Sequence, residues 1–266
     1  MTSPLRQPDF ARAEAAAFRI TKNYGCLHPA DIKLEDLAWD RGVTVSTGVL
    51  VGSEGRLIRK GRRGLIRVRA SENQIGRRRF SIAHELGHWE LHQETQWIVC
   101  SSENLRDYKT SPLEAEANTF AAELLMPAYL VRERFEKSMP SFALIKSIAD
   151  EFQVSLTAAG IRLLHFTRQE CILVAARDRM ISWWVSKTDR FGVWLRRGDP
   201  LSEESVAYHA FDGSVNADEV EDVPTDAWFP NRPNSIEFGV SEQSMFLPRF
   251  GVVLTLLTLG DADEDD

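Results

Sequence analysis

The chain has 266 residues, of which 43% are hydrophobic and 27% are charged, and this balance excludes a disordered, collagenous or fibrous protein. It is long enough to form one large domain or two modest ones with a sizeable buried core. Its 32 basic and 39 acidic residues give a net charge of −7, which argues against a protein that grips nucleic acid through its overall charge.

Three widely spaced cysteines, Cys26, Cys100 and Cys171, form neither a disulfide framework nor a CxxC metal pair, which points to a reducing compartment. The N-terminus lacks the apolar core of a signal peptide. The most apolar stretch, residues 250–259, is about half as long as the ~20 residues that a membrane-spanning helix needs. We therefore expect a cytoplasmic protein that makes no contact with a membrane.

Two helices and two strands are expected in the first part of the chain. Residues 8–24 place apolar side chains at helical spacing before Gly25, and residues 29–41 form a second helical segment. Alternation with a period of two predicts strands over residues 43–52 and 64–70. The glycine-rich basic segment between them, SEGRLIRKGRRG, predicts a turn, so that the two strands would form a hairpin.

Two stronger helices are expected next. Residues 77–92, RRRFSIAHELGHWELH, form the first of them. The second begins after Ser111, where SPLE combines a capping serine, a proline at the first helical position and a glutamate three residues after the cap. It should end before Pro127, because a proline disfavours helix in the residue that precedes it. Residues 141–166 predict two short helices around a tight connection.

The character of the sequence changes near Gln169. From Cys171 onward, the chain contains short tryptophan-rich segments that are broken by Asp, Gly and Pro and are typical of strands. These segments are CILVAA, MISWWVS and FGVWLR. The last six residues, DADEDD, carry five acids and predict a solvated tail.

The segment His84-Glu85-Leu86-Gly87-His88 concentrates the residues that indicate catalysis. Histidines four positions apart lie on one face of a helix and can present both imidazoles to a single zinc ion. Glu85 lies to one side, where it can take the proton of a water molecule whose pKa zinc has lowered toward ~7. This HExxH arrangement is that of metallopeptidases.

A catalytic zinc ion needs three protein ligands and an open position. The third histidine of a metzincin would stand ten residues after His84, where this chain has Glu94. His92 lies a further ~6 Å along the helix axis from His88, at 1.5 Å per residue. We therefore expect His92 to support or pack against the site rather than to bind the metal.

The helix that begins after Ser111 offers Glu114 and Glu116 as the third ligand. The two lie about 200° apart around the helix, at ~100° per residue, so that only one can face the zinc ion. Glu114 shares a face with Asn118, a spacing that lets one residue bind metal while the other supports a zinc histidine. Glu114 could also serve as the carboxylate of the capping box. We predict Glu114 as the ligand, with Glu116 as the alternative.

The two motifs together resemble a known family. RRRFSIAHELGHWELH, followed about 25 residues later by EAEANTFAAELLMP, strongly resembles the ImmA/IrrE family of zinc metallopeptidases, over about residues 10–166. The resemblance implies that His84 and His88 bind zinc, that Glu85 is the general base, and that a glutamate of EAEAN is the third ligand. It also implies cleavage of a helix-turn-helix transcriptional repressor, which derepresses mobile-element, DNA-damage or phage-defence genes.

The resemblance further implies an α+β architecture. It consists of a gluzincin-like metallopeptidase core with a small sheet over residues 1–135 and a helix-turn-helix-like bundle over residues 136–169. A C-terminal mixed α/β sensory domain, likened to GAF folds, occupies residues 170–260. The acidic tail takes up residues 261–266.

Residues 142–165 follow the helix-turn-helix pattern, but they are a poor match to a DNA reader. The second helix offers mainly Thr157 and Arg162 to reach base edges, and Gln153 stands where the turn usually has a glycine. We therefore expect a structural bundle that covers the peptidase core.

Ten basic residues and one acid, Glu72, lie between Arg56 and Arg79. This patch can contact phosphates or an acidic substrate segment, or it can be a solvated face of the hairpin. The edge of the hairpin can also hold an extended substrate by strand addition.

A transition-state oxyanion needs a donor besides the zinc ion. Four residues are candidates by type, and the sequence does not choose among them: Tyr108, Tyr129, Arg162 and His165.

The sequence thus predicts a zinc-dependent endopeptidase that cleaves a helix-turn-helix repressor. Two alternatives remain open. One is a DNA-binding regulator with a non-catalytic zinc site, and the other is a protein that titrates its repressor without cutting it.

Overall fold

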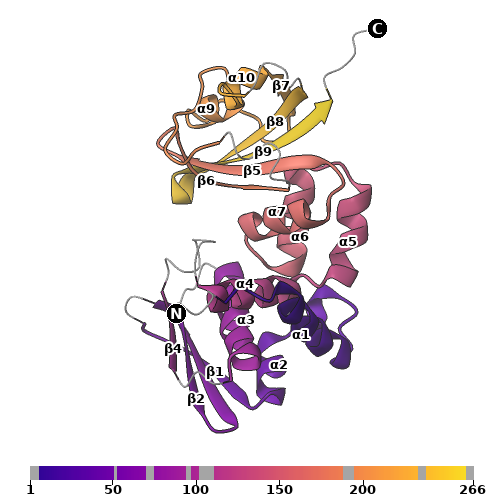
Figure 1. Cartoon of the computed structure of the whole chain (residues 1–266), viewed down its shortest axis with the longest axis vertical. Coiled ribbons are helices and arrows are strands. Elements are labelled where there is room, and N and C mark those ends of the chain that lie inside the picture. Colours follow the sequence, from indigo (N-terminus) through magenta and orange to yellow (C-terminus); the bar gives the residue numbers. More distant parts are fainter. Residues whose placement is uncertain are drawn as a thin grey trace, which may run out of the picture. The chain divides into compact units, whose positions relative to one another are not determined.

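The computed structural model describes residues 6–50, 53–69, 75–93, 97–101, 111–187, 195–232 and 238–261 (Figure 1). The fold is mixed α+β, as predicted, with helices and two separate sheets. The chain divides by packing into two units, which are described separately. The first unit joins Met1–Val131 to Ile148–Ser155, and the second joins Arg132–Ser147 to Leu156–Asp266.

The predicted functional boundaries at 135/136 and 169/170 stay a prediction, because packing alone does not test which segment carries which function. None of the helices in the described part of the chain has the length and apolar character that crossing a lipid bilayer requires.

The first unit contains a four-stranded sheet in the order β1-β3-β2-β4. Strands β1 and β3 pair in parallel, whereas β2 pairs antiparallel with both β3 and β4. The bounds of the four strands are β1 Val43–Gly48, β2 Ser53–Lys60, β3 Arg63–Arg69 and β4 Trp97–Ser101.

The predicted hairpin between residues 43–52 and 64–70 is wrong, because β2 occupies most of the expected turn and the outer two segments pair in parallel. The hairpin joins β2 to β3 through Gly61 and Arg62, since Lys60 pairs with Arg63. Because β2 contains a glycine and several basic residues, its sequence lacks the clear apolar alternation of a strand, although Leu57 is fully buried.

Four helices of the first unit lie on one another and on the sheet (Figure 1). Helix α3 packs against β2 and β3, α4 packs against α3, and α1 packs against α4. Their bounds are α1 Phe10–Asn23, α2 Leu34–Asp40, α3 Ile75–Leu91 and α4 Pro112–Leu125. The helices expected at residues 8–24, at 77–92 and after Ser111 are confirmed to within a few residues.

The single helix predicted over residues 29–41 is wrong. A 3-10 turn over Pro29–Asp31 is followed by a separate helix α2. The carboxylate of Asp31 accepts hydrogen bonds from the backbone N–H groups of Leu27 and His28 at 2.9 and 2.8 Å. These bonds cap the start of the turn, and the turn ends at Ile32, whose φ of −81° and ψ of 74° are not helical.

Three helices follow α4 in the chain and precede the first strand of the second unit. The sequence predicts α6 Phe142–Phe152 and α7 Leu156–Phe166, and both are present, whereas α5 Ala128–Lys137 was not predicted. Gln153, between α6 and α7, adopts φ of 53°. This is the left-handed conformation that a glycine usually supplies in such a turn.

The second unit is built on an antiparallel sheet in the order β6-β5-β9-β8-β7. The short helices α9 Val206–Ala210 and α10 Thr225–Trp228 pack against its later strands, and α7 packs against β5. The bounds of the strands are β5 Glu170–Arg177, β6 Met180–Ser186, β7 Glu221–Val223, β8 Phe238–Leu247 and β9 Val252–Asp261.

Strand β5 is buried on both faces of this sheet. Ile172 and Val174 join the core that contains α9 and α10, while Leu173 lies on the other face against Gly160 of α7. The strands predicted at CILVAA and MISWWVS are confirmed as β5 and β6. Residues 191–194 of FGVWLR lie outside the described residues, and Leu195 and Arg196 are not in a strand.

Candidate metal centre

Helix α3 places His84 and His88 side by side, because four residues make slightly more than one helical turn. Their Nε2 atoms are 3.1 Å apart, and each side chain is 1% exposed. Burial lowers the pKa of His88 to about 4, so that its ring is neutral at neutral pH and can offer a lone pair to a metal ion.

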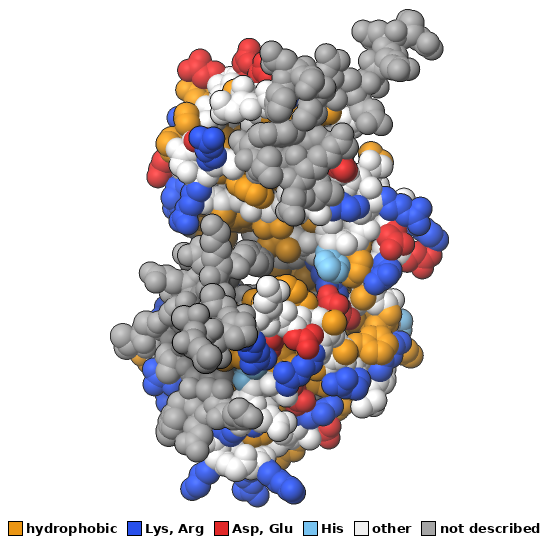
Figure 2. Space-filling view, viewed as in Figure 1, with side chains coloured by type: hydrophobic (Ala, Val, Ile, Leu, Met, Phe, Trp, Pro, Cys, Tyr) orange, Lys and Arg blue, Asp and Glu red, His pale blue; other side chains and the backbone are white. Residues whose placement is uncertain are grey.

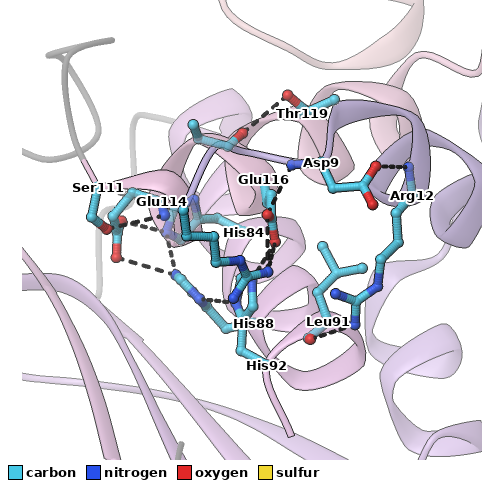
Figure 3. Close-up of polar contacts among 12 residues, drawn as sticks. Asp9, Arg12, His84, His88, Leu91, His92, Ser111, Glu114, Glu116 and Thr119 are labelled. Atoms are coloured by element: carbon cyan, nitrogen blue, oxygen red, sulfur yellow. Dashed lines mark hydrogen bonds and ion pairs between the residues drawn. The ribbon is translucent and has the colours of Figure 1, made fainter. Parts of the chain in front are cut away.

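Helix α4 brings Glu114 to the two histidines. Its Oε2 atom lies 3.2 Å from Nε2 of His84, and its Oε1 atom lies 3.4 Å from Nε2 of His88 (Figure 3). Although burial by itself raises the pKa of Glu114, the adjacent rings of His84 and His88 hold it below its usual range. The helix starts where predicted, since the Ser111 hydroxyl accepts the backbone N–H of Glu114.

Gly87 allows α4 to approach α3 this closely. A Cβ atom on Gly87 would come within 3.0 Å of the ring of Phe120 and 3.2 Å of the backbone of Ala117. Both residues belong to α4, where Ala117 lies within one turn of Glu114 and Phe120 within one turn of Asn118. The glycine inside HELGH therefore sets the distance across which Glu114 meets the histidines.

The donor atoms have the spacing that a tetrahedral metal site requires. Nitrogen and oxygen ligands about 2.0–2.1 Å from a zinc ion lie about 3.3 Å from one another in tetrahedral geometry. The two Nε2 atoms are 3.1 Å apart, Oε2 of Glu114 lies 3.2 Å from Nε2 of His84, and Oε1 of Glu114 lies 3.4 Å from Nε2 of His88. The triad His84, His88 and Glu114 can thus bind a metal ion, and its two imidazoles and one carboxylate are ligands that zinc accepts.

Each histidine is oriented by a partner at its other ring nitrogen. Nδ1 of His84 lies 2.9 Å from Oδ1 of Asn118, one turn beyond Glu114 on α4. Nδ1 of His88 lies 2.8 Å from Nδ1 of His92 (Figure 3). Asn118 and His92 therefore lie where a residue that supports a metal ligand is expected to lie.

Glu116 faces away from the triad, as the helical phase requires if Glu114 faces toward it. Its Oε2 atom lies 2.9 Å from Nε2 of His92, and its Oε1 atom accepts the backbone N–H of Asp9 at 2.9 Å. The guanidinium of Arg6 donates to both carboxylate oxygens, at 3.0 and 3.1 Å. The structure thus places Glu116 against His92 and the start of α1.

Glu85 lies beside the triad and against the sheet. Its side chain is buried, and its carboxylate packs on Gly55 of β2. Gly55 was missed because it lies in the segment that was expected to form a turn. Arg6 and Asp9 were missed as well, because they come from a segment more than a hundred residues away from Glu116. A glycine within the strand facing the HExxH helix would have been the available signal for Gly55.

Of the candidate oxyanion donors, Tyr129 belongs to the first unit. The hydroxyl of Tyr129 donates to the backbone carbonyl of Cys26 at 2.8 Å. Tyr108 lies outside the described residues. Arg162 and His165 belong to the second unit, where the guanidinium of Arg162 stacks on Phe166 at 4.7 Å.

Several of the basic residues between Arg56 and Arg79 serve the fold. A β-bulge at Glu54 turns its buried carboxylate toward Arg69 and Arg77, at 3.6 and 3.3 Å. Arg59 stacks on Trp89 and donates to the carbonyl of that residue at 2.7 Å.

Other members of the patch are exposed, and blue side chains stand in Figure 2 at the end where β2 turns into β3 in Figure 1. These exposed residues are Lys60, Arg62, Arg63 and Arg67.

Comparison with known proteins gives two similarities. Residues 40–164 match the peptidase M78 family model, described as the IrrE N-terminal-like domain, which confirms the resemblance seen in the sequence. A solved structure of a Mycobacterium tuberculosis transcriptional regulator is similar with a TM-score of 0.60 and 18% sequence identity. The similarity covers 93% of this chain and 76% of that chain, and at this identity it shows a shared fold. Curated proteins of known function include no match to the sequence.

Proposed function

We propose that the protein is a zinc-dependent endopeptidase, because residues 40–164 match the peptidase M78 family model, described as the IrrE N-terminal-like domain. The observation that carries this proposal is the spacing of 3.1 to 3.4 Å among donor atoms of His84, His88 and Glu114. Three protein ligands leave a fourth position for water or substrate, whereas structural zinc sites normally have four protein ligands.

A zinc ion held by these residues supplies Lewis acidity and lowers the pKa of water to about 7. Glu85, next to His84 on the helix, accepts the proton of the attacking water on its carboxylate. It then returns this proton to the amide nitrogen as the peptide bond breaks. The backbone of β2 at Gly55 and the buried environment keep this carboxylate in one place. Asn118 and His92 orient the two histidines.

The proposed substrate is a helix-turn-helix transcriptional repressor, and the proposed role of residues 170–260 is to sense the signal that starts cleavage. The similar fold of a protein described as a transcriptional regulator supports a regulatory role. Cys26 and Cys171 are free and buried, which supports a reducing, cytoplasmic setting. A GAF-like identity for the C-terminal domain rests on the family architecture.

A comparison of wild-type and Glu85→Gln protein in cells of the native host tests this function. Mass spectrometry of protein N-termini, with and without DNA damage, should find a new N-terminus in a repressor with wild type alone. The variant should keep its zinc ion, because Glu85 is not one of the three ligands. Cleavage by the variant at the wild-type rate would remove Glu85 from the mechanism, and no new N-terminus under any condition would contradict the endopeptidase.

The same experiment separates the two alternatives. A titrating protein would bind its repressor and leave the intact mass of that repressor unchanged, with either variant. A DNA-binding regulator would keep its full regulatory function in the Glu85→Gln variant, and its affinity for DNA would fall steeply as the salt concentration rises. The structure weakens the DNA-binding alternative, since Arg162, one of two residues expected to reach base edges, is 5% exposed.

A further inference from the structure

We propose that His92, Glu116 and Arg6 form a directed hydrogen-bonded chain that fixes the tautomer of His88 and so prepares it to bind the metal ion. Through this chain, the segment that precedes α1 becomes part of the metal centre. The proposal rests on the metal site of the proposed function, but it concerns residues outside the ligand triad.

The chain runs without a gap from Arg6 to His88, and Figure 3 labels Glu116, His92 and His88 along it. Arg6, whose side chain is 54% exposed, donates to both oxygens of Glu116. Glu116 lies 2.9 Å from Nε2 of His92, and Nδ1 of His92 lies 2.8 Å from Nδ1 of His88. The two inner members, His92 and Glu116, are 5% and 0% exposed.

The carboxylate sets the direction of the chain. An ionised carboxylate can only accept hydrogen bonds, so Nε2 of His92 must carry the proton that it shares with Glu116. In a neutral ring, Nδ1 of His92 then has a lone pair and accepts a proton from Nδ1 of His88. This leaves the lone pair of His88 on Nε2, which is the atom that faces His84 and Glu114. In the competing tautomer, Nε2–H of His88 would donate to Glu114 over a longer distance of 3.4 Å, and two lone pairs would face each other between the Nδ1 atoms of His88 and His92, 2.8 Å apart.

Arg6 and the backbone N–H of Asp9 supply the donors that hold Glu116 as an acceptor. If Glu116 rotated away or lost these donors, the buried rings of His88 and His92 could adopt either tautomer. In the wrong tautomer, His88 would point a proton at the metal position. His84 has a simpler arrangement, since one amide oxygen of Asn118 accepts from its Nδ1. The charged chain is thus specific to His88.

The pair His92→Asn and His92→Leu tests the chain, because the two side chains have similar size and shape. The amide oxygen of asparagine lies near the position of Nδ1 and can still accept from His88, whereas leucine cannot. Both variants lose the contact with Glu116. Long-range ¹⁵N NMR on the full-length, metal-free protein should show His88 of wild type and of His92→Asn with its proton on Nδ1. The leucine variant should show a mixture of tautomers.

Zinc affinity, measured by competition with a chromophoric chelator, should fall about 10–100-fold in His92→Leu and stay within about threefold of wild type in His92→Asn. Arg6→Ala tests the outer end of the chain. Because the side chain of Arg6 is exposed, its loss should not prevent folding, and we expect zinc affinity to fall by about threefold to tenfold. Arg78→Ala is the matched control, because Arg78 pairs at 2.7 Å with Glu35, outside the chain, and this variant should bind zinc as wild type does.

A wild-type His88 that carries its proton on Nε2 in the metal-free protein would overturn the proposal. So would a folded His92→Leu variant with wild-type zinc affinity. If that variant fails to fold, Arg6→Ala decides, and equal affinity in Arg6→Ala and Arg78→Ala counts against the chain. Because the tautomer is measured without metal and without substrate, the chain can fail while the endopeptidase stands, and the reverse also holds.

Discussion

A Cβ atom on Gly55 would lie 2.6 Å from Oε1 of Glu85 and 3.0 Å from its Cγ atom. The backbone of β2 therefore forms the wall against which the proposed general base rests. No side chain fits at this position unless Glu85 moves, because all three nearest atoms belong to that buried side chain.

Gly55→Ala should accordingly impair catalysis more than metal binding. The added methyl group displaces the carboxylate of Glu85 by about 1 Å, and we expect kcat to fall by about 100-fold. The zinc stoichiometry should stay at one, because the triad does not contact Gly55. Gly260→Ala is the control, since nothing lies within 4 Å of a Cβ atom there. Wild-type kcat in Gly55→Ala would show that Glu85 does not depend on this wall.

Replacement of Glu114 and replacement of Glu116 should have different effects on zinc binding. Glu114→Gln removes the carboxylate that lies 3.2 and 3.4 Å from the ligand histidines, so stoichiometric zinc should be lost on dialysis. Glu116→Gln keeps the triad and should bind one zinc ion about tenfold more weakly, because its side chain supports His92 from outside. Metal analysis after dialysis measures both. Zinc loss in Glu116→Gln with retention in Glu114→Gln would exchange their roles.

The HExxH helix and the capped start of α4 were predicted correctly because both depend on local sequence. A four-residue period and a capping serine act within one or two turns of helix. The choice of Glu114 over Glu116 rests on its spacing to Asn118 on one face of the helix, and it stays a prediction. The sequence could not supply the partners of Glu116, since Arg6 and Asp9 approach it only through the packing of α1 on α4.

The sheet of the first unit shows where sequence patterns mislead. Arginines and glycine in β2 are typical of a turn, yet Gly55 makes room for Glu85 and Arg59 stacks on Trp89. Both residues contact side chains of α3, and a local sequence pattern does not contain such contacts. In the second unit, β9 was noticed as an apolar stretch, but its pairing with β5 and β8 depends on strands far away in the chain.

Glu242 should be a strong determinant of the stability of the second unit. It is fully buried in β8, and burial raises the pKa of its carboxyl group despite several hydrogen bonds. It accepts the N–H groups of Val206 and Ala207 at 3.1 and 2.6 Å and that of Trp228 at 2.7 Å.

Glu242→Gln would turn an amide NH₂ group toward these donors and should lower the free energy of unfolding by about 2–3 kcal/mol. Urea unfolding followed by tryptophan fluorescence measures the change, with the exposed Glu221→Gln of β7 as the control. Equal midpoints for the two variants would show that the buried carboxylate is dispensable.

Acid should destabilise the metal-free protein between about pH 6.5 and pH 4. Burial lowers the pKa of His88 from 6.5 to about 4, so in this range the unfolded chain binds a proton at His88 that the folded chain does not. The free energy of unfolding therefore falls as the pH falls, and this contribution is fully present above about pH 6.5. Glu114 acts in the same direction, because its pKa also lies below its usual value in the folded protein.

Urea unfolding in the presence of a chelator, at several pH values from 7.5 to about 4.5, measures this dependence. In His88→Gln, the position no longer titrates, and the loss of stability over this range should be smaller by up to about 3 kcal/mol. His209→Gln is the control, because the exposed ring of His209 lies in the second unit. The same pH dependence in His88→Gln and wild type would show that the buried ring protonates without unfolding the protein. Burial would then not be what keeps His88 neutral for metal binding.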